Sequence, residues 1–336
     1  MTTTEQTAAP AEATPRTTGR RLRPGAVELF VGVLLVAVLL RGWLVGATNS
    51  ARVLTWLTIF VSIVIQAIPF VVLGTVVSAA IAALVPPAFF AKALPRRPVL
   101  AVPVAGVAGV VLPGCECGSV PIAGALVRRG VTPAAALAFL LSAPAINPVV
   151  LVATFVAFPG RPQMVVARLV ASLVASVVMG WLWLRLGRTE WLRVPHRPEL
   201  AGLGRAAAFV AACRTDLVQA GGYLVIGGLT AATLNVAVPQ KLLHAVGGQP
   251  VLSVLALGLL AVVLSICSEA DAFVAASLTQ FSWTAKLAFL VVGPMVDAKL
   301  FAMQAGTFGR RFAVRFAPAT FVVAVLAAVI VGAVLL

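Results

Sequence analysis

The feature that most constrains this chain is a series of apolar runs, each about as long as a bilayer is thick. Such runs cover residues 26–45, 56–84, 133–158, 165–184, 216–238, 285–305 and 316–336. A helix crosses the hydrocarbon core with about 20 predominantly apolar residues. The chain is 61% hydrophobic and only 10% charged over 336 residues, which excludes a soluble domain. We therefore expect an all-α polytopic membrane protein with about seven full spans.

The basic residues of the chain set the expected topology. Most of the lysines and arginines fall in residues 16–23, 92–97, 128–129, 185–214 and 310–315. Cytoplasmic loops carry an excess of such residues, so these segments and the N-terminus are expected to be cytoplasmic. The net charge of +15 would suggest nucleic acid in a soluble protein, but here it is explained by these loops. The expected partners are the lipid bilayer and a small solute, with no nucleic acid, and a homo-oligomer is an open alternative.

One hydrophobic run is interrupted by the sequence LPGCECGSVP at residues 112–121. A Pro-Gly pair cannot continue a helix, because proline lacks an amide donor and glycine is conformationally loose. Unpaired backbone and a carboxylate are costly in hydrocarbon, so this break must face protein or a water-filled cavity. It therefore predicts a solute site at membrane depth, the alternative being an ordinary interfacial loop. Residues 251–267 and 270–281 form a second interrupted pair.

The two halves of the chain match each other at polar positions. At one constant offset Gln66 corresponds to Gln219 and Glu116 to Glu269, and after a small slip Asn147 corresponds to Asp297. The basic loops fit best if each interrupted pair is a re-entrant hairpin that enters and leaves on one side. This arrangement predicts two inverted structural repeats whose broken elements meet at the midplane.

The expected organisation then follows from the repeats and the loops between them. We expect a disordered cytoplasmic tail (1–25), a first span and outer loop (26–55), repeat 1 (56–184), a basic cytoplasmic linker (185–215), repeat 2 (216–305) and a last span (306–336).

The candidate site residues are the thiols, acids and amide at these breaks. They are Cys115, Glu116, Cys117, Asn147, Cys267, Glu269, Asp271 and Asp297. Cys115 and Cys117 are the candidate ligands of a soft metal or metalloid centre, because sulfur is a soft ligand. If their segment is extended, the two thiols share one face and Glu116 points away. Asp297 and Lys299 are two residues apart, so they are not expected to share a helix face.

Two alternatives for these residues stay open at this point. The cysteines can instead be small buried packing residues, and the acids can be purely structural. If the acids are functional, Glu116 and Glu269 are the candidates for proton or cation coupling, because burial disfavours a charged carboxylate.

Residues 112–149, reading LPGCECGSVPIAGALVRRGVTPAAALAFLLSAPAINPVV, resemble the signature of a bacterial predicted-permease family that includes the ArsP-like organoarsenical efflux permeases. Residues 265–271 and 293–297 resemble the second half of that family, and the resemblance covers about residues 55–307. It implies a multi-pass permease of the bacterial plasma membrane, with trivalent arsenic bound at Cys115 and Cys117. Glu116 stands where the family pattern has a small hydroxyl residue, which favours a cationic or proton-coupled substrate.

The expected function is therefore a permease that moves a small, soft solute across the plasma membrane, and not an enzyme. The phosphate-binding loop of nucleotide-driven pumps does not occur in the chain, so an ion gradient or an external ATPase must supply the energy. No cofactor is expected. Two other classes remain open, a membrane thiol oxidoreductase that uses Cys115 and Cys117, and a passive channel.

Overall fold

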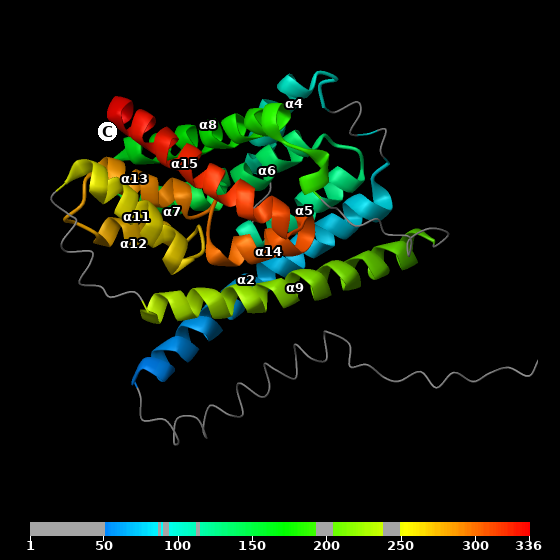
Figure 1. Ribbon diagram of the computed structural model, residues 1–336, viewed down its shortest axis with the longest axis horizontal. Helices are drawn as coiled ribbons and strands as arrows, with labels where there is room; N and C mark the ends of the chain where they lie inside the picture. The colour runs from blue at the N-terminus through cyan, green and yellow to red at the C-terminus, as the bar shows by residue number, and fades with distance from the viewer. Residues whose placement is uncertain (1–50, 87–88, 90–93, 112–114, 193–203, 238–248) are drawn as a thin grey trace, which may run out of the picture.

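A computed structural model of the chain describes residues 51–86, 89, 94–111, 115–192, 204–237 and 249–336 (Figure 1). Every regular element within these residues is helical. The expected cytoplasmic tail, the first span at 26–45 and the start of the first break at 112–114 lie outside the described residues.

The first half of the described chain runs from a long helix, through a break, to a second long helix. Its elements are α2 (Ala51–Leu84), α4 (Pro98–Ala108), the 3-10 turn η1 (Gly109–Val111), α5 (Glu116–Arg128), α6 (Pro133–Ile146), α7 (Pro148–Ala157) and α8 (Pro162–Leu186). A second 3-10 turn, η2 (Thr189–Trp191), follows α8.

The second half repeats this order of long and short helices. Its elements are α9 (Arg205–Ala237), α11 (Pro250–Leu264), α12 (Asp271–Ser277), α13 (Trp283–Val292), α14 (Ala298–Phe308) and α15 (Arg310–Leu335). The helix α9 begins inside the segment that the sequence analysis assigned to the basic linker.

Several helix starts follow directly from local sequence. Proline occupies the first turn of α4, α6, α7, α8 and α11, where its missing amide hydrogen costs nothing and its fixed φ suits the helix. Asn147 caps α7 by accepting a hydrogen bond from the Val150 amide at 3.0 Å. Asp297 caps α14 in the same way, accepting from the Leu300 amide at 2.5 Å. The two residues that were matched in the sequence, Asn147 and Asp297, thus have the same capping role.

Five helical segments in the described residues are long and apolar enough to cross a membrane, namely 52–84, 133–157, 162–186, 205–237 and 310–335. Outward-facing side chains such as Ile65, Val152 and Leu259 are more than half exposed, as expected for surfaces that contact lipid. The expected all-helical polytopic membrane protein is therefore confirmed.

The span expected at 285–305 is wrong as a continuous helix. It consists of α13 and α14, separated by residues 293–297. The reason is local, because Pro294 cannot donate a backbone hydrogen bond and Asp297 is extended at φ −144°. The segment expected at 133–158 is likewise divided, since α6 ends at Ile146 and α7 starts after the extended Asn147.

Corresponding helices of the two halves pack against each other in antiparallel pairs. The helices α2 and α9 lie side by side along one edge of the molecule (Figure 1). Trp56 near the start of α2 donates to Thr233 near the end of α9 at 3.1 Å, and Ser78 donates to Asp216 at 2.5 Å. At the opposite edge α8 packs on α15, where Trp183 meets Phe312 with ring centroids 5.3 Å apart.

The centre of the molecule is filled by α6 and α13 and by the short helices that follow the breaks. The side chains of α6 from Ala134 to Ile146 are buried, and those of α13 from Ala285 to Val292 are buried as well. Contacts that cross between the halves here include α5 against α14 and α7 against α12. These contacts bring the first break and the second break together in the interior.

Candidate functional site

The first break ends in an extended residue and a helix start. Cys115 has φ −82° and ψ 176°, and α5 begins at Glu116. Cys115, Glu116 and Cys117 are all almost fully buried, with at most 1% of each residue exposed. An extended Cys115–Cys117 segment, the condition under which Glu116 would point away from both thiols, is therefore not found, because Glu116 and Cys117 already belong to the first turn of α5. Glu116 does not point away from the first thiol.

The second break lies between the end of α11 and the start of α12. Ser265 adopts the left-handed conformation at φ 49°, which ends α11 and turns the chain back. Its hydroxyl accepts a hydrogen bond from the Ala298 amide at 3.2 Å, so this break is tied to the start of α14. Two residues further, Cys267 donates its thiol to the Glu269 carboxylate at 2.6 Å.

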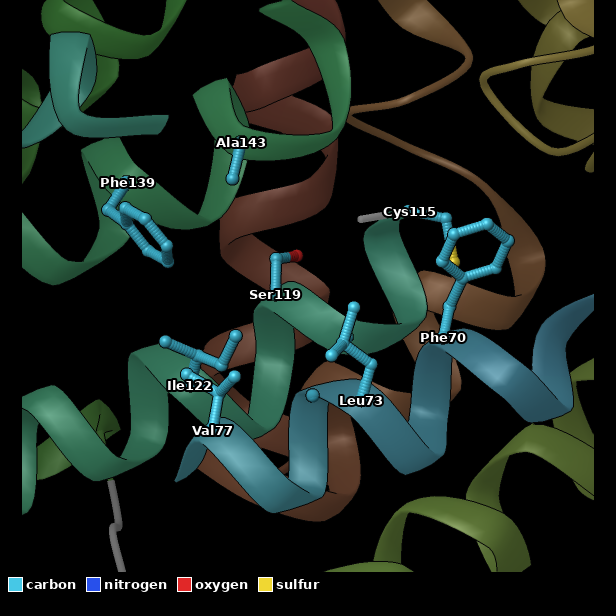
Figure 2. A pocket seen from close by; sticks show the side chains of 10 residues that line it. Phe70, Leu73, Val77, Cys115, Ser119, Ile122, Phe139 and Ala143 are labelled. Carbon is cyan, nitrogen blue, oxygen red and sulfur yellow. The ribbon is translucent and has the colours of Figure 1, made fainter. Parts of the chain in front are cut away.

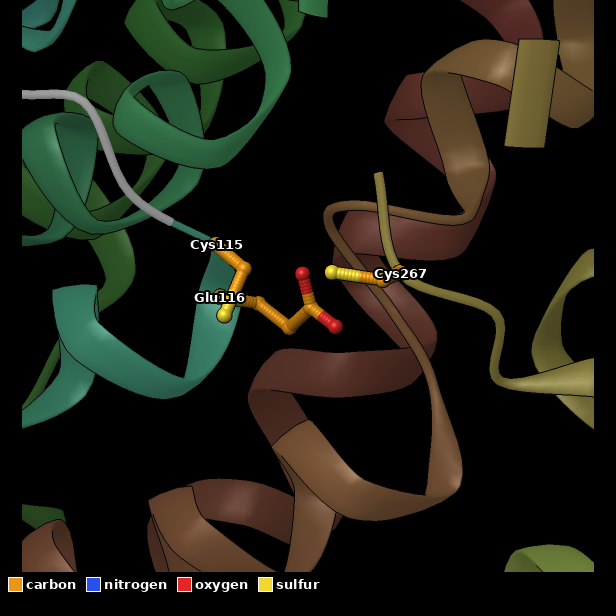
Figure 3. A group of neighbouring side chains, drawn as sticks. All are labelled: Cys115, Glu116 and Cys267. Atoms are coloured by element: carbon orange, nitrogen blue, oxygen red, sulfur yellow. The ribbon is translucent and has the colours of Figure 1, made fainter. Parts of the chain in front are cut away.

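The two breaks meet at a group of two thiols and one carboxylate (Figure 3). One ligand atom from each of Cys115, Glu116 and Cys267 lies within 4.8 Å of the other two. Figure 3 shows Cys115 and Glu116 at the start of α5 and Cys267 facing them from the second break. The Cys115 thiol also interacts with the Cys117 thiol. Cys267 rather than Cys117 therefore shares this group with Cys115 and Glu116, so the Cys115/Cys117 pair expected from sequence was incomplete.

A buried lysine, Lys299, connects this group to the carboxylate of Asp297. The Lys299 ammonium is 2.7 Å from Glu116 Oε1 and 3.4 Å from Asp297 Oδ2. Its side chain is only 3% exposed. The expectation that Asp297 and Lys299 do not face each other is wrong, because Asp297 is the N-cap residue and lies outside the helical repeat. Its extended backbone turns the carboxylate toward the first turn of α14.

A second buried ion pair holds Asp271. The Arg168 guanidinium donates to both carboxylate oxygens of Asp271, at 2.9 and 2.7 Å. It also donates to the Thr154 hydroxyl at 2.8 Å and to the Ser268 carbonyl at 3.3 Å. Arg168 and Asp271 thus form a bidentate salt bridge, which is stronger than a salt bridge with a single hydrogen bond. This pair fixes the second break to α7 and α8.

The remaining expected site residues lie beside these groups. Glu269 is half-buried and accepts from Cys267. Asn147 is fully buried and uses its side chain within its own chain segment, accepting from Val150 and donating to the Ala143 carbonyl at 3.3 Å. Its role in the fold is to separate α6 from α7.

Lys299 and Arg168 were not among the residues assigned to the site from sequence. Both are cations inside apolar helical segments, and such residues are costly unless they pair with an acid. That cost is the signal that could have found them. The sequence alone does not identify their partners, since Glu116 and Lys299 are 183 positions apart.

Two cavities adjoin the cluster. A small one of about 20 Å³ lies between α2, α5 and α6, and is lined by Cys115 and mostly apolar side chains such as Phe70 and Phe139 (Figure 2). That volume is about enough for one water molecule. A larger cavity of about 830 Å³ lies between α9, α11, α14 and α15, with Asp297 and Arg310 among its lining residues. Asp297, although buried, therefore borders both the charged cluster and the larger cavity.

Long apolar helices around buried, paired acids, cations and thiols define a multi-pass membrane protein with an internal polar site. The chain belongs to the ArsP_1 family of predicted permeases, whose family model matches residues 52–333. The family resemblance seen in the sequence is thereby confirmed.

Two relatives support the same assignment. A protein of Streptococcus mutans, whose name describes a subunit of a two-component membrane permease complex, is 33% identical over 290 residues, covering 84% of this chain and 96% of that protein. The UPF0718 protein YcgR of Bacillus subtilis is 37% identical over 268 residues, covering 76% and 89%. No solved structure matches the chain significantly. The protein is thus a membrane transporter of the bacterial plasma membrane.

Proposed function

We propose that this permease carries a small, soft solute across the plasma membrane, and that the solute binds where the two breaks meet. The solute class is a metal ion, a metalloid or a thiol-reactive compound. The observation that carries the proposal is the group of Cys115, Glu116 and Cys267, whose ligand atoms lie within 4.8 Å of one another. Sulfur ligands favour soft centres, and one carboxylate beside them favours a positive charge.

The contribution of both halves to this group fits an alternating-access transporter. Cys115 and Glu116 come from the first half and Cys267 comes from the second, so a relative movement of the halves changes the site itself. Binding sites at the interface of repeats, built from interrupted helices, are common in secondary transporters.

Inverted repeats with re-entrant hairpins are part of this proposal. The equal order of elements in the halves supports them, as do the antiparallel pairs of α2 with α9 and α8 with α15. Two halves of the same orientation would instead place corresponding helices parallel to each other. The hairpin is supported by Gly180 of α8, which packs closely against both Val102 near the start of α4 and Ala134 near the start of α6. A short turn joins the end of α5 to the start of α6. The start of α6 in turn shares the contact at Gly180 with α4. These contacts support a hairpin in which the start of α4 and the end of α5 are on the same side of the membrane.

We further propose that an ion gradient drives transport through Glu269, one of the two coupling acids expected from sequence. Glu269 is an acid in an apolar setting and accepts a hydrogen bond from the Cys267 thiol of the binding group. The other expected acid, Glu116, belongs to the binding group itself. The name of the Streptococcus mutans relative describes a subunit of a two-component complex, so a second protein component is part of the proposal. The homo-oligomer that the sequence left open is the alternative to such a component.

The experiment that tests this function is uptake of Cd(II) and of a trivalent arsenical into proteoliposomes that contain the purified protein. Wild type should take up at least one of these solutes, and Cys115→Ser and Cys267→Ser should each lose that uptake. Cys213→Ser is the matched control, because Cys213 lies in α9 and makes its contact with Thr75. Normal uptake by both site variants would rule the thiols out as ligands.

The same preparation separates the alternative functions. A passive channel would equilibrate the solute without a gradient. A membrane thiol oxidoreductase would show a thiol count that changes with redox state, and the interaction of the Cys115 thiol with the Cys267 thiol makes that measurement worthwhile.

A further inference from the structure

The central cluster holds more acids than cations among the described residues. Glu116 and Asp297 contact one ammonium, that of Lys299, and Glu269 adds a third acid beside Cys267, while Arg168 is already paired with Asp271. Two carboxylate oxygens in this cluster are buried and accept no hydrogen bond, namely Glu116 Oε2 and Asp297 Oδ2. Buried acceptors without a donor are costly, so the cluster is set up to receive more positive charge than it holds.

Lys299 lies between the two acids that have an oxygen to spare. Its ammonium makes a short ion pair with Glu116 Oε1 at 2.7 Å and a looser contact with Asp297 Oδ2 at 3.4 Å. A hydrogen-bonded pair of this kind spans about 2.7–2.9 Å. A shift of the ammonium by a fraction of an ångström would therefore pair it fully with Asp297. Glu116, in contrast, is also one of the three residues of the proposed binding group.

We propose that Lys299 is a tethered cation that occupies Glu116 while the transporter is empty, and that a cationic solute displaces it onto Asp297. This inference rests on the proposed function and specifies its solute as a cation. The ammonium keeps its proton throughout, so the step is an exchange of partners and not a titration. Glu116 is neutralised by Lys299 in the empty state and by the solute in the loaded state.

The exchange of partners by Lys299 requires only a small structural change. Lys299 belongs to the first turn of α14, and its backbone is held by close packing against Gly227 of α9. Only the long, flexible side chain needs to move. Asp297 is fixed as the N-cap of the same helix through its other oxygen, Oδ1, which leaves Oδ2 available for the ammonium.

The proposal predicts opposite effects for variants of Lys299 and Asp297 on Cd(II) binding. Lys299→Met removes the competing charge, so the affinity for Cd(II) should rise about tenfold or more, as expected for a close charge pair. Asp297→Asn removes the second partner of the ammonium, so the affinity should fall about tenfold. Asparagine is as good an N-cap as aspartate, so α14 keeps its start. Lys299→Arg keeps the charge and should bind Cd(II) within a few fold of wild type.

A flux measurement adds a readout that a merely structural lysine would not move. Lys299→Met should retain exchange of Cd(II) for Cd(II) across the proteoliposome membrane, because that exchange never needs the empty carrier to reorient. Net uptake should be lost, because the empty carrier now has an uncompensated Glu116.

The measurement is Cd(II) binding by thiolate charge-transfer absorption on purified protein, together with both flux assays. An unchanged or lower affinity in Lys299→Met, or an unchanged or higher affinity in Asp297→Asn, would overturn the proposal. If Lys299→Met does not fold, Asp297→Asn decides alone. Failure of wild type to bind Cd(II) or the arsenical would instead refute the proposed function, which keeps the two failures apart.

Discussion

Glu116 and Lys299 form a buried ion pair of 2.7 Å although 183 positions separate them in the sequence. Glu116 begins the helix after the first break, and Lys299 belongs to the first turn of the helix after residues 293–297. The pair therefore connects the first break of one half to the start of α14 in the other half. A movement that separates α5 from α14 would therefore break or replace this contact.

The first prediction concerns which thiols bind the solute. Cys267→Ser should weaken Cd(II) binding as strongly as Cys115→Ser, by about tenfold or more, because a hydroxyl does not replace a soft ligand. Cys117→Ser should have a smaller effect, since Cys117 interacts with Cys115 but lies outside the three-residue group. Titration of each purified variant with Cd(II) measures this order. A larger loss in Cys117→Ser than in Cys267→Ser would contradict it.

The second prediction concerns the ion pair that holds the second break. Arg168→Met leaves Asp271 as a buried, unpaired charge, which should reduce the free energy of unfolding by about 3–5 kcal/mol. The double variant Arg168→Met/Asp271→Asn removes both charges and should recover part of that loss. Thermal unfolding in detergent, followed by circular dichroism, gives the comparison.

Either result for the stability of the double variant identifies what Arg168 contributes. Recovery would identify the pair as a structural tie between α8 and the second break. A double variant no more stable than Arg168→Met would show that the arginine acts through its contacts with Thr154 and Ser268.

The third prediction concerns the close packing that places Lys299. A Cβ atom added at Gly227 would lie 2.7 Å from the Lys299 Cα, so Gly227→Ala must push α14 away from α9. Overpacking of this kind costs about 1–3 kcal/mol, and here it should also reduce uptake because it moves Lys299. The matched control is Gly222→Ala in the same helix, where an added Cβ would meet nothing within 4 Å.

The control variant should be neutral or slightly more stable than wild type, because alanine is favoured over glycine in a helix by about 0.5–1 kcal/mol. Uptake and thermal unfolding of the two variants are measured side by side. Equal behaviour of Gly227→Ala and Gly222→Ala would show that the tight contact does not matter for transport.

The sequence predicted those features of the fold that are encoded by residues close together in the chain. The break at residues 112–121 was found because proline, glycine and polar residues interrupt an apolar run within a few positions, and the break at 268–269 was found because Ser268 and Glu269 do so. Asn147 and Asp297 were matched by the repeat, and both turned out to cap helices. The break at 293–297 carried a Gly-Pro signal of the same kind, but the apolar residues around it outweighed that signal in the assignment of a continuous span.

The pairing across the site could not be predicted for a different reason. Which side chains meet depends on how one helix is rotated and shifted against another, and apolar helices carry little local information on either. The sequence assigned Cys115, Cys117 and Cys267 to a site made from both breaks, but it named Cys115 and Cys117 as the soft ligands and did not predict that Cys267 shares a group with Cys115 and Glu116. The start of α5 at Glu116 was not predicted either, and it places the Glu116 carboxylate near the thiols of Cys115 and Cys267.

The fourth prediction concerns topology. In a background without the four native cysteines, single cysteines introduced as Arg96→Cys and Arg129→Cys should both be labelled by an impermeant maleimide only from the cytoplasmic side. The reason is that α4 and α5 are proposed to enter and leave on the same face. Labelling of the Arg129→Cys variant from outside in intact cells would end the hairpin proposal.

The fifth prediction concerns coupling. Glu269→Gln removes an acid that accepts from Cys267 while keeping its size, so it should abolish transport or make it insensitive to pH. Uptake into proteoliposomes over a range of external pH, with wild type in parallel, gives the result. A wild-type pH profile in this variant would show that the carboxylate only orients the thiol.

The central claim is that the two breaks together form one soft-ligand site, and its most direct measurement is X-ray absorption spectroscopy of Cd(II) bound to the purified protein. The account predicts a metal coordinated by two sulfur atoms and at least one oxygen, with one sulfur lost in Cys267→Ser and none lost in Cys213→Ser. Coordination by oxygen alone, or two sulfur ligands that persist in Cys267→Ser, would contradict it.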